Sequence, residues 1–182
     1  KVQVLSGKRG LGGGIAFFTS EKPLLTFIKK TLGSEFNGEE VAFISLAEKA
    51  DITKESYISI TYDTVSKLPI LVFCEEGGVD IDEVKAKNPE KIITLELDPF
   101  EGPNQKNLVK IFGRGREKYA DFALRLWDAF SRFDCRLVEV NPIAEVGGNL
   151  VAIDAKIILD DAGLLRHKEI DVLPKGAASA VP

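Results

Sequence analysis

The residues best suited to chemistry lie in a stretch from position 138 to 156, where the sequence pattern predicts a β-hairpin. Gly147-Gly148 is a two-residue turn signal, and it separates two runs in which apolar and polar residues alternate. A turn centred on this pair places Asn141 opposite Asp154. Because successive side chains of a strand point to opposite faces, the two residues then share one face of the hairpin.

This pairing brings two oxygen donors together. Opposed residues have β-carbons about 5 Å apart, so Asn141 and Asp154 could share one hard cation. Magnesium takes oxygen ligands and often binds through one or two side chains plus waters and phosphates. Glu139 lies opposite Lys156 on the same face, and Pro142, which has no N–H to donate, favours a bulge in the first strand. A solvated polar face is the alternative interpretation, and neither metal-site side chain is expected to matter for folding.

A glycine-rich segment near the N-terminus suggests a second kind of chemistry. Residues 6–14, SGKRGLGGG, hold five glycines and the adjacent cations Lys8 and Arg9. Such a backbone can bend closely around a ligand, and successive amides can surround an anion. The spacing fits neither the P-loop nor the Rossmann fingerprint. We interpret it as a hairpin between strands at 1–5 and 15–18 that covers nucleotide phosphates, with a plain exposed loop as the alternative.

The overall composition is that of an ordinary globular protein. The 24 basic and 28 acidic residues give a net charge of −4, which offers no general electrostatic reason to bind nucleic acid or an acidic membrane. No apolar run approaches the length that spans a bilayer, and no signal peptide is evident. Cys74 and Cys135 lie far apart in apolar runs, which predicts buried free thiols in a reducing compartment.

Periodicity predicts the elements that must position these residues. Helices are expected over 21–32 (with Ser20 as N-cap), 79–87 and 117–133 (with Trp127 in the core). Strands are expected over 41–46, 55–63, 68–74, 92–97 and 157–159, and an irregular loop over 98–104. The mixture lacks strict alternation, so it favours an α+β fold with mostly antiparallel sheets. His167, in a charged tail, is expected at the solvated surface.

Four sequence blocks together resemble the β subunit of succinate–CoA ligase and its relatives in the ATP-grasp superfamily. The blocks are KVQVLSGKRGLGGG at 1–14, EGGVDIDEV at 76–84, VEVNP at 138–142 and IDAK at 153–156. They occur in the family's order and span nearly the whole chain, which makes them far more specific together than singly. The resemblance implies an ATP-grasp fold that holds a nucleotide between two α+β subdomains.

The resemblance also implies a domain organisation. Residues 1–52 match part of the N-terminal nucleotide-binding subdomain, and 53–168 match the C-terminal subdomain with the metal hairpin. Residues 169–182 then form a linker toward a CoA-ligase domain that follows in the family. We therefore expect this chain to be a piece of a longer protein, because residue 1 opens directly into a strand pattern.

Individual residues match the family's functional positions. The resemblance assigns nucleotide binding to Lys1, Lys8, Arg9, Gly10, Ala47, Ala50 and Glu55. It assigns magnesium to Asn141 and Asp154, and it places Glu139 near the site where a phosphohistidine of the partner α subunit docks. The sequence departs from the family twice, since Lys8 replaces a glycine of the phosphate loop and Ala47 replaces a glutamate beside the base and ribose.

The chemistry implied by this resemblance is phosphoryl transfer from Mg²⁺–ATP, or GTP, to the partner's histidine. The phosphoryl group then passes to a carboxylic acid and is displaced by CoA, whose site lies in the α subunit. Succinate is the expected acid, with malate–CoA and citrate–CoA ligases as alternatives. A cytoplasmic location is implied, or the mitochondrial matrix in a eukaryote. A non-catalytic nucleotide-binding module and a purely structural subunit are the other classes that the sequence leaves open.

Overall fold

The computed structural model describes residues 1–6, 9–10, 12–113 and 115–171. The chain divides into two compact units, one containing residues 1–50 and the other residues 51–171. The linker expected over 169–182 lies outside the described residues from position 172 onward, as does Lys8 of the glycine-rich segment. Among the described helices, none combines the length and apolar character needed to cross a membrane.

Among its described residues, the first unit contains one helix and four short strands. They are β1 (Val2–Gln3), α1 (Glu21–Thr31), β2 (Glu35–Phe36), β3 (Glu39–Glu40) and β4 (Phe43–Ile44). Strand β1 pairs antiparallel with β4, and β2 pairs antiparallel with β3. Helix α1 begins after Ser20 as predicted, although the Ser20 side chain makes no capping hydrogen bond.

The strand predicted over 15–18 is wrong, and so is the hairpin that it would have closed. Strand β1 pairs instead with β4, where Val2 lies opposite Ile44. The glycine-rich segment closes on itself, because the Gly14 N–H donates to the Arg9 carbonyl and the Val2 N–H donates to the Gly14 carbonyl, both at 2.8 Å. Residues 15–18 form a loop, in which the Phe17 side chain is 73% exposed.

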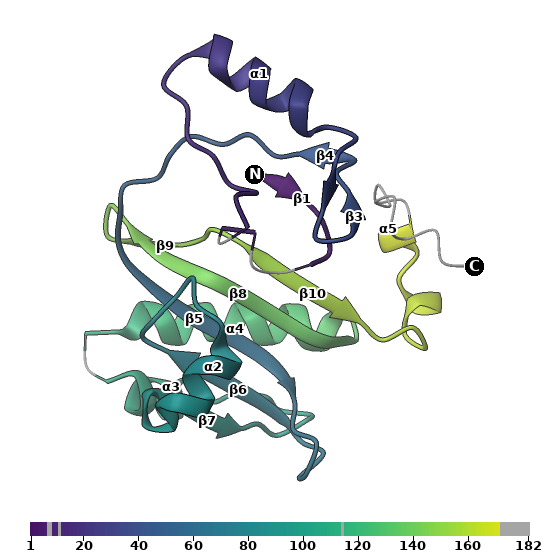
Figure 1. Ribbon diagram of the computed structural model, residues 1–182. Coiled ribbons are helices and arrows are strands. Elements are labelled where there is room, and N and C mark those ends of the chain that lie inside the picture. The colour runs from purple at the N-terminus through teal and green to yellow at the C-terminus, as the bar shows by residue number, and fades with distance from the viewer. Residues whose placement is uncertain (7–8, 11, 114, 172–182) are drawn as a thin grey trace. The chain divides into compact units, whose positions relative to one another are not determined.

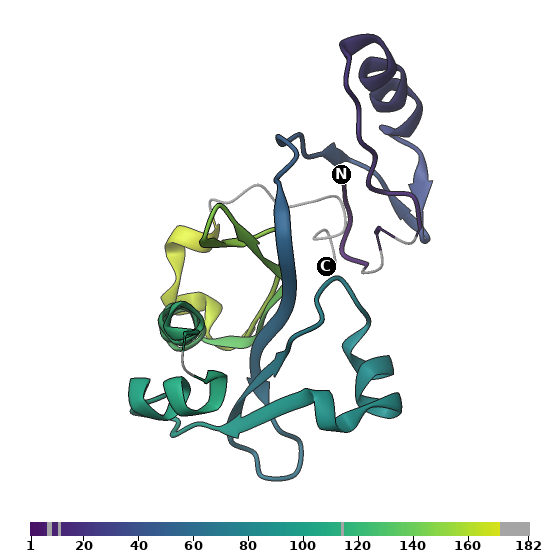
Figure 2. The same ribbon diagram turned by 90° about the vertical axis from the view of Figure 1, so that its left-hand side faces the viewer.

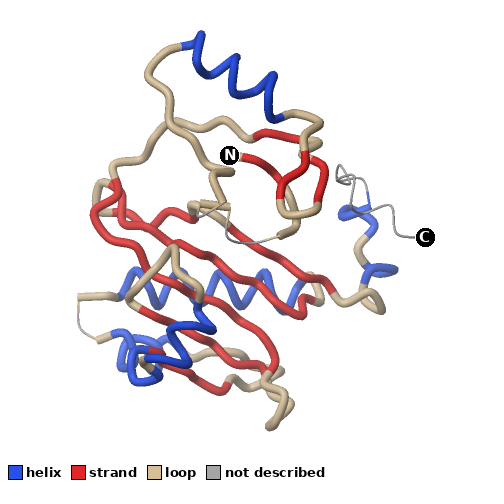
Figure 3. The backbone as a smooth tube through the Cα atoms, in the orientation of Figure 1, coloured by secondary structure: helices blue, strands red, loops and turns tan. Residues whose placement is uncertain are grey.

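In the described part of the second unit, six strands form one antiparallel sheet, which confirms the predicted fold class (Figures 1 and 3). The order is β10-β8-β5-β6-β7, and β9 also pairs with β8. The strands are β5 (Ile52–Tyr62), β6 (Pro69–Cys74), β7 (Ile92–Glu96), β8 (Cys135–Val146), β9 (Asn149–Ala152) and β10 (Ala155–Leu159). The helices are α2 (Ile81–Lys87), α3 (Gln105–Phe112), α4 (Glu117–Arg132) and α5 (Lys168–Asp171), with 3₁₀ turns at Pro89–Lys91 and Leu164–Arg166.

Helices cover both faces of this sheet (Figure 2). Helices α3 and α4 pack on one face, where alternate strand residues such as Ile58 and Val140 are at most 3% exposed. Trp127 packs against this core, as predicted. Helix α2 packs on the opposite face, over a smaller cluster that includes Tyr57 and Cys74. Cys74 and Cys135 are free thiols and both are buried, as predicted.

Two further differences from the sequence predictions concern the second unit. Helix α3 was not expected; it begins after Asn104, whose side chain accepts a hydrogen bond from the Lys106 N–H at 2.9 Å. The prediction of a solvated His167 is wrong, since its side chain is only 11% exposed. The segment after β10 turns back onto Asp134, whose Oδ2 lies 2.7 Å from His167 Nε2, and this hydrogen bond lowers the pKa of Asp134.

Candidate functional site

The hairpin adopts the register predicted from its turn. Gly147 and Gly148 have φ values of 54° and 81°, the left-handed conformations that a tight two-residue turn needs. Strand β9 pairs with β8 in the predicted register, and this register continues into β10, where Lys156 lies opposite Glu139. Between these two segments the Asn141 N–H donates to the Asp154 carbonyl at 3.1 Å. Asn141 and Asp154 therefore oppose one another as expected.

The bulge expected at Pro142 is also present. In the pairing of β5 with β8, Ser56 lies opposite Ile143, whereas Ile58 lies opposite Val140. Two residues of β8, Asn141 and Pro142, thus oppose a single residue of β5. The bulge brings Asn141 to the loop that precedes α2.

Asn141 uses both ends of its amide to hold that loop, residues 75–80. Its Oδ1 accepts a hydrogen bond from the Gly78 N–H at 2.8 Å, and its Nδ2 donates to the Val79 carbonyl at 3.0 Å. The two contacts fix the orientation of the amide, because one partner is only a donor and the other only an acceptor. They correct the expectation that this side chain has no part in folding. An amide oxygen has two acceptor sites, so Oδ1 can still coordinate a cation.

Glu55 and Glu139 lie on the same face of the sheet as Asn141. A Cβ added to Gly78 would lie 3.1 Å from Glu55 Oε2, which places this carboxylate against the 75–80 loop. Glu139 is half-buried, and its Oε2 accepts a hydrogen bond from the Tyr57 hydroxyl at 3.0 Å. Three carboxylates and one amide, from Glu55, Glu139, Asp154 and Asn141, are thus brought to one face of the second unit.

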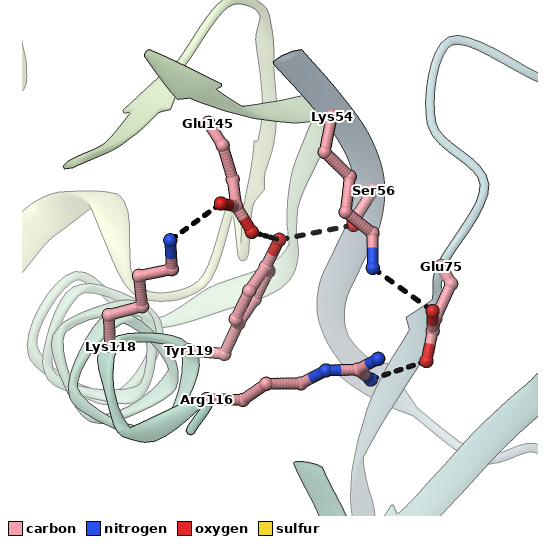
Figure 4. Close-up of polar contacts among 7 residues, drawn as sticks. All are labelled: Lys54, Ser56, Glu75, Arg116, Lys118, Tyr119 and Glu145. Atoms are coloured by element: carbon pink, nitrogen blue, oxygen red, sulfur yellow. Dashed lines mark hydrogen bonds and ion pairs between the residues drawn. The ribbon is translucent and has the colours of Figure 1, made fainter. Parts of the chain in front are cut away.

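Ion pairs hold the start of the 75–80 loop (Figure 4). One oxygen of Glu75 accepts a hydrogen bond from Lys54 Nζ at 3.0 Å, and the other accepts one from the Arg116 guanidinium. Arg116 first, and then Lys54, hold the pKa of Glu75 below its usual range. Glu76 pairs with Lys91 Nζ at 2.6 Å. The loop is therefore a fixed part of the site.

A second group of polar residues joins α4 to the strands on the face that α3 and α4 cover (Figure 4). Glu145 accepts hydrogen bonds from Lys118 Nζ at 2.7 Å and from the Tyr119 hydroxyl at 3.0 Å, and Tyr119 also lies 3.3 Å from Ser56 Oγ. The hydrogen bond from Lys118 is the main cause that lowers the pKa of Glu145, while burial raises the pKa of Tyr119. These contacts brace β5 and β8, the strands that carry the candidate site.

We expect Gly77→Ala to destabilise the second unit by about 1–3 kcal/mol, the usual penalty for overpacking a close contact. A Cβ at this position would lie 2.6 Å from the backbone nitrogen of Ser56 and 2.7 Å from its carbonyl oxygen, and strand β5 cannot move away without breaking its ladders. Thermal unfolding measures the effect. The matched control is Glu76→Ala, which removes only an exposed ion pair worth at most about 1 kcal/mol. Equal unfolding temperatures for the two variants would contradict the close packing.

In the first unit, a carboxylate anchors the glycine-rich segment. Glu39 of β3 accepts hydrogen bonds from the backbone N–H groups of Leu5 at 2.8 Å and Ser6 at 2.7 Å. The Leu5 contact is the main cause that lowers the pKa of Glu39. Glu39 was not among the residues predicted from the sequence, although Asn37-Gly38, a strong hairpin signal, would have placed it on a strand. Both turn residues have positive φ, 51° and 82°.

The nucleotide-binding residues expected in the first unit lie near this segment or after β4. Arg9 Nη1 donates to the Val4 carbonyl at 3.3 Å, and Gly10 follows it in the turn that Gly13 and Gly14 close. The carbonyl of Lys1 accepts a hydrogen bond from the Ser45 N–H at 2.8 Å. Ala47 and Ala50 lie in the irregular stretch between β4 and β5. Their nucleotide-binding roles remain predictions.

The two oxygen donors on the hairpin suit a cation that takes the rest of its ligands from waters and phosphates. Asn141 offers an amide oxygen and Asp154 a half-buried carboxylate from the opposing position. Among the described residues, no group of three or more His, Cys, Asp or Glu side chains is arranged to hold a metal. Two oxygen donors, completed by waters and phosphates, match the way in which magnesium binds with a nucleotide.

Comparison with known proteins identifies the family. Residues 1–145 match the family model described as an ATP-grasp domain. The chain belongs to the ATP-grasp family. Its curated relatives include two proteins called "Succinate--CoA ligase [ADP-forming] subunit beta". That of Rubrobacter xylanophilus is 38% identical over 177 residues, 93% of this chain and 46% of the relative. That of Methanocaldococcus jannaschii is 39% identical over 174 residues, 92% of this chain and 48% of the relative.

Solved structures support the ATP-grasp fold. The ATP citrate lyase of Methanothrix soehngenii, determined with citrate and coenzyme A, superposes with a TM-score of 0.69 at 21% identity. The alignment covers 97% of this ATP-grasp chain and 42% of the lyase chain. At this identity the likeness shows the fold alone. The chain spans about half the length of the curated relatives that it matches, so it corresponds to their ATP-grasp portion.

Proposed function

We propose that this chain is the ATP-grasp portion of the β subunit of an ADP-forming succinate–CoA ligase. In the full-length protein it would bind a magnesium nucleotide and transfer the terminal phosphoryl group to a histidine of a partner α subunit. The observation that carries the proposal is the pairing of Asn141 with Asp154 inside a sequence that is 38–39% identical to β subunits of this enzyme over more than 90% of its length.

Each residue then has a physical task. Asn141 and Asp154 would hold the magnesium ion, which offsets negative charge on the nucleotide phosphates when bound. The backbone of the glycine-rich segment and the Arg9 guanidinium would hold the phosphates in line for transfer. Glu55, fixed against the 75–80 loop, would contact the nucleotide, with Lys1, Lys8, Gly10, Ala47 and Ala50 contributing from the first unit.

Glu139 is the residue that we assign to the transfer step. Its carboxylate would accept a hydrogen bond from the partner's histidine and orient the imidazole toward the terminal phosphoryl group. The phosphohistidine would then transfer its phosphoryl group to a carboxylate of succinate, and the thiol of CoA would attack the acyl carbon and release inorganic phosphate. The α subunit and the small carboxylic acid are therefore the expected partners.

The test uses the full-length β subunit, purified with its α subunit, and nucleotide labelled in the terminal phosphate. We expect magnesium-dependent labelling of the α subunit and acyl-CoA formation with succinate, faster than with malate or citrate. Residues 1–182 alone should form no acyl-CoA. Faster turnover with malate or citrate would reassign the substrate. Magnesium-dependent nucleotide binding without labelling of any partner would identify a non-catalytic ATP-grasp module.

A further inference from the structure

A short hydrogen-bonded chain ends at the carboxylate of Glu139. The hydroxyl oxygen of Tyr57 lies 3.0 Å from Glu139 Oε2 and 3.0 Å from Ser59 Oγ. The tyrosine has only one hydroxyl proton, and an ionised carboxylate can only accept. The tyrosine proton therefore points to Glu139, and the Ser59 hydroxyl donates to the tyrosine oxygen.

Packing fixes the position of this chain. Tyr57 is 4% exposed and Ser59 is 1% exposed, and the tyrosine ring packs with Cys74 and Val84 in the cluster beneath α2. Ser59 lies directly opposite Glu139 in the pairing of β5 with β8. The hydroxyl that meets Glu139 is thus held by the sheet and by α2. Burial raises the pKa of Tyr57, which keeps the donor protonated.

The two oxygens of Glu139 have different environments. Oε2 is occupied by the Tyr57 hydroxyl. Over the ranges 1–6, 9–10, 12–113 and 115–171, Oε1 has no hydrogen-bond or ion-pair partner. A single buried donor on one oxygen leaves the other oriented and able to accept a proton donor from a ligand or a partner chain.

We propose that Tyr57 is a positioning residue: its hydroxyl holds Oε2 of Glu139, so that Oε1 accepts a hydrogen bond from the histidine of the partner subunit. The inference rests on the proposed function and adds a residue to it. Tyr57 touches neither the nucleotide nor the histidine in this scheme. It acts by restricting the carboxylate to one orientation before the partner docks. Less conformational entropy is then lost when the groups are aligned for phosphoryl transfer.

The chain supplies a matched comparison on the opposite face of the sheet. Tyr119 also donates to a carboxylate at 3.0 Å, but its acceptor, Glu145, is already paired with Lys118. Glu145 thus has a structural task and lies away from the candidate site. Tyr119→Phe removes the same kind of hydrogen bond as Tyr57→Phe without touching Glu139.

The test measures single-turnover labelling of the α subunit by the full-length complex. Tyr57→Phe removes a hydrogen bond to a charged group. We expect this variant to lower the single-turnover rate constant at saturating nucleotide about tenfold. The KM for nucleotide should stay within about twofold of wild type, because uniform substrate binding is unchanged. Ser59→Ala should lower the same rate constant by a smaller factor. The rate constant of Tyr119→Phe should stay within about twofold of the wild-type value.

A double-mutant cycle separates positioning from packing. In a Glu139→Gln background, Tyr57→Phe should cause no further loss, because its effect passes through the carboxylate. An equal loss in both backgrounds would assign the effect to packing and overturn the inference, as would a wild-type rate for Tyr57→Phe. If the wild-type complex labels no partner histidine, the proposed function itself fails and this inference fails with it.

Discussion

Asp154→Asn is expected to lower magnesium-dependent labelling of the α subunit on the order of a hundredfold, because metal-ion stabilisation of phosphoryl transfer is worth several kcal/mol. Asp154 supplies the only carboxylate of the proposed ligand pair, and asparagine keeps its size while removing the charge. The difference in labelling rate between Asp154→Asn and wild type should become smaller as the magnesium concentration is raised, since added metal compensates for weaker binding. The measurement is the initial rate of labelling by the full-length complex across a magnesium titration.

Two controls sharpen this prediction. Asp161→Asn removes the charge of an exposed aspartate just after β10 and should leave the titration unchanged. Asn141→Ala should weaken metal-dependent transfer less than Asp154→Asn, yet lower stability by about 1–3 kcal/mol through the loss of two hydrogen bonds. Those bonds hold Gly78 and Val79. Wild-type titrations for both Asp154→Asn and Asn141→Ala would place the metal elsewhere.

Arg9→Ala is expected to cause a loss of roughly tenfold or more in nucleotide use, because Arg9 would contribute a charge-assisted contact to the phosphates. Arg9 lies inside the closed turn of the glycine-rich segment, where its carbonyl accepts from the Gly14 N–H at 2.8 Å. Lys8→Ala changes the neighbouring cation and should have a smaller effect, since Arg9 alone keeps the family's residue. Nucleotide affinity and labelling rate are measured for both variants. Affinities and rates equal to wild type in both variants would show that the segment only connects its neighbouring elements and does not bind the nucleotide.

Local signals predicted the site's backbone well. Gly147-Gly148 determines the hairpin register, and that register alone places Asp154 opposite Asn141. The strand over 15–18 failed for a physical reason: four apolar residues indicate a strand only where a partner with free ladder groups is available. The Val2 N–H already donates to the Gly14 carbonyl, one residue before this segment, and β1 pairs with β4 rather than with residues 15–18.

The contacts that support the site are long-range, so the sequence alone did not reveal them. Asn141 and Gly78 are 63 residues apart, and Tyr57 and Glu139 are 82 residues apart. A side-chain amide that bonds to a distant loop leaves no periodic pattern. Only the fold, which sets β8 beside β5 and the loop beside β8, decides which of several polar residues become partners.

The continuous register of the hairpin limits where related chains can gain or lose residues. Extra residues at the Gly147-Gly148 tip would lengthen the turn and leave every pair below it aligned. One residue removed between Ala152 and Ala155 would shift the strand by one position, which would turn the Asp154 side chain to the face that carries Val140. Insertions and deletions in related chains should therefore occur at the Gly147-Gly148 turn, whereas the segment from this turn to Asp154 should keep a constant length.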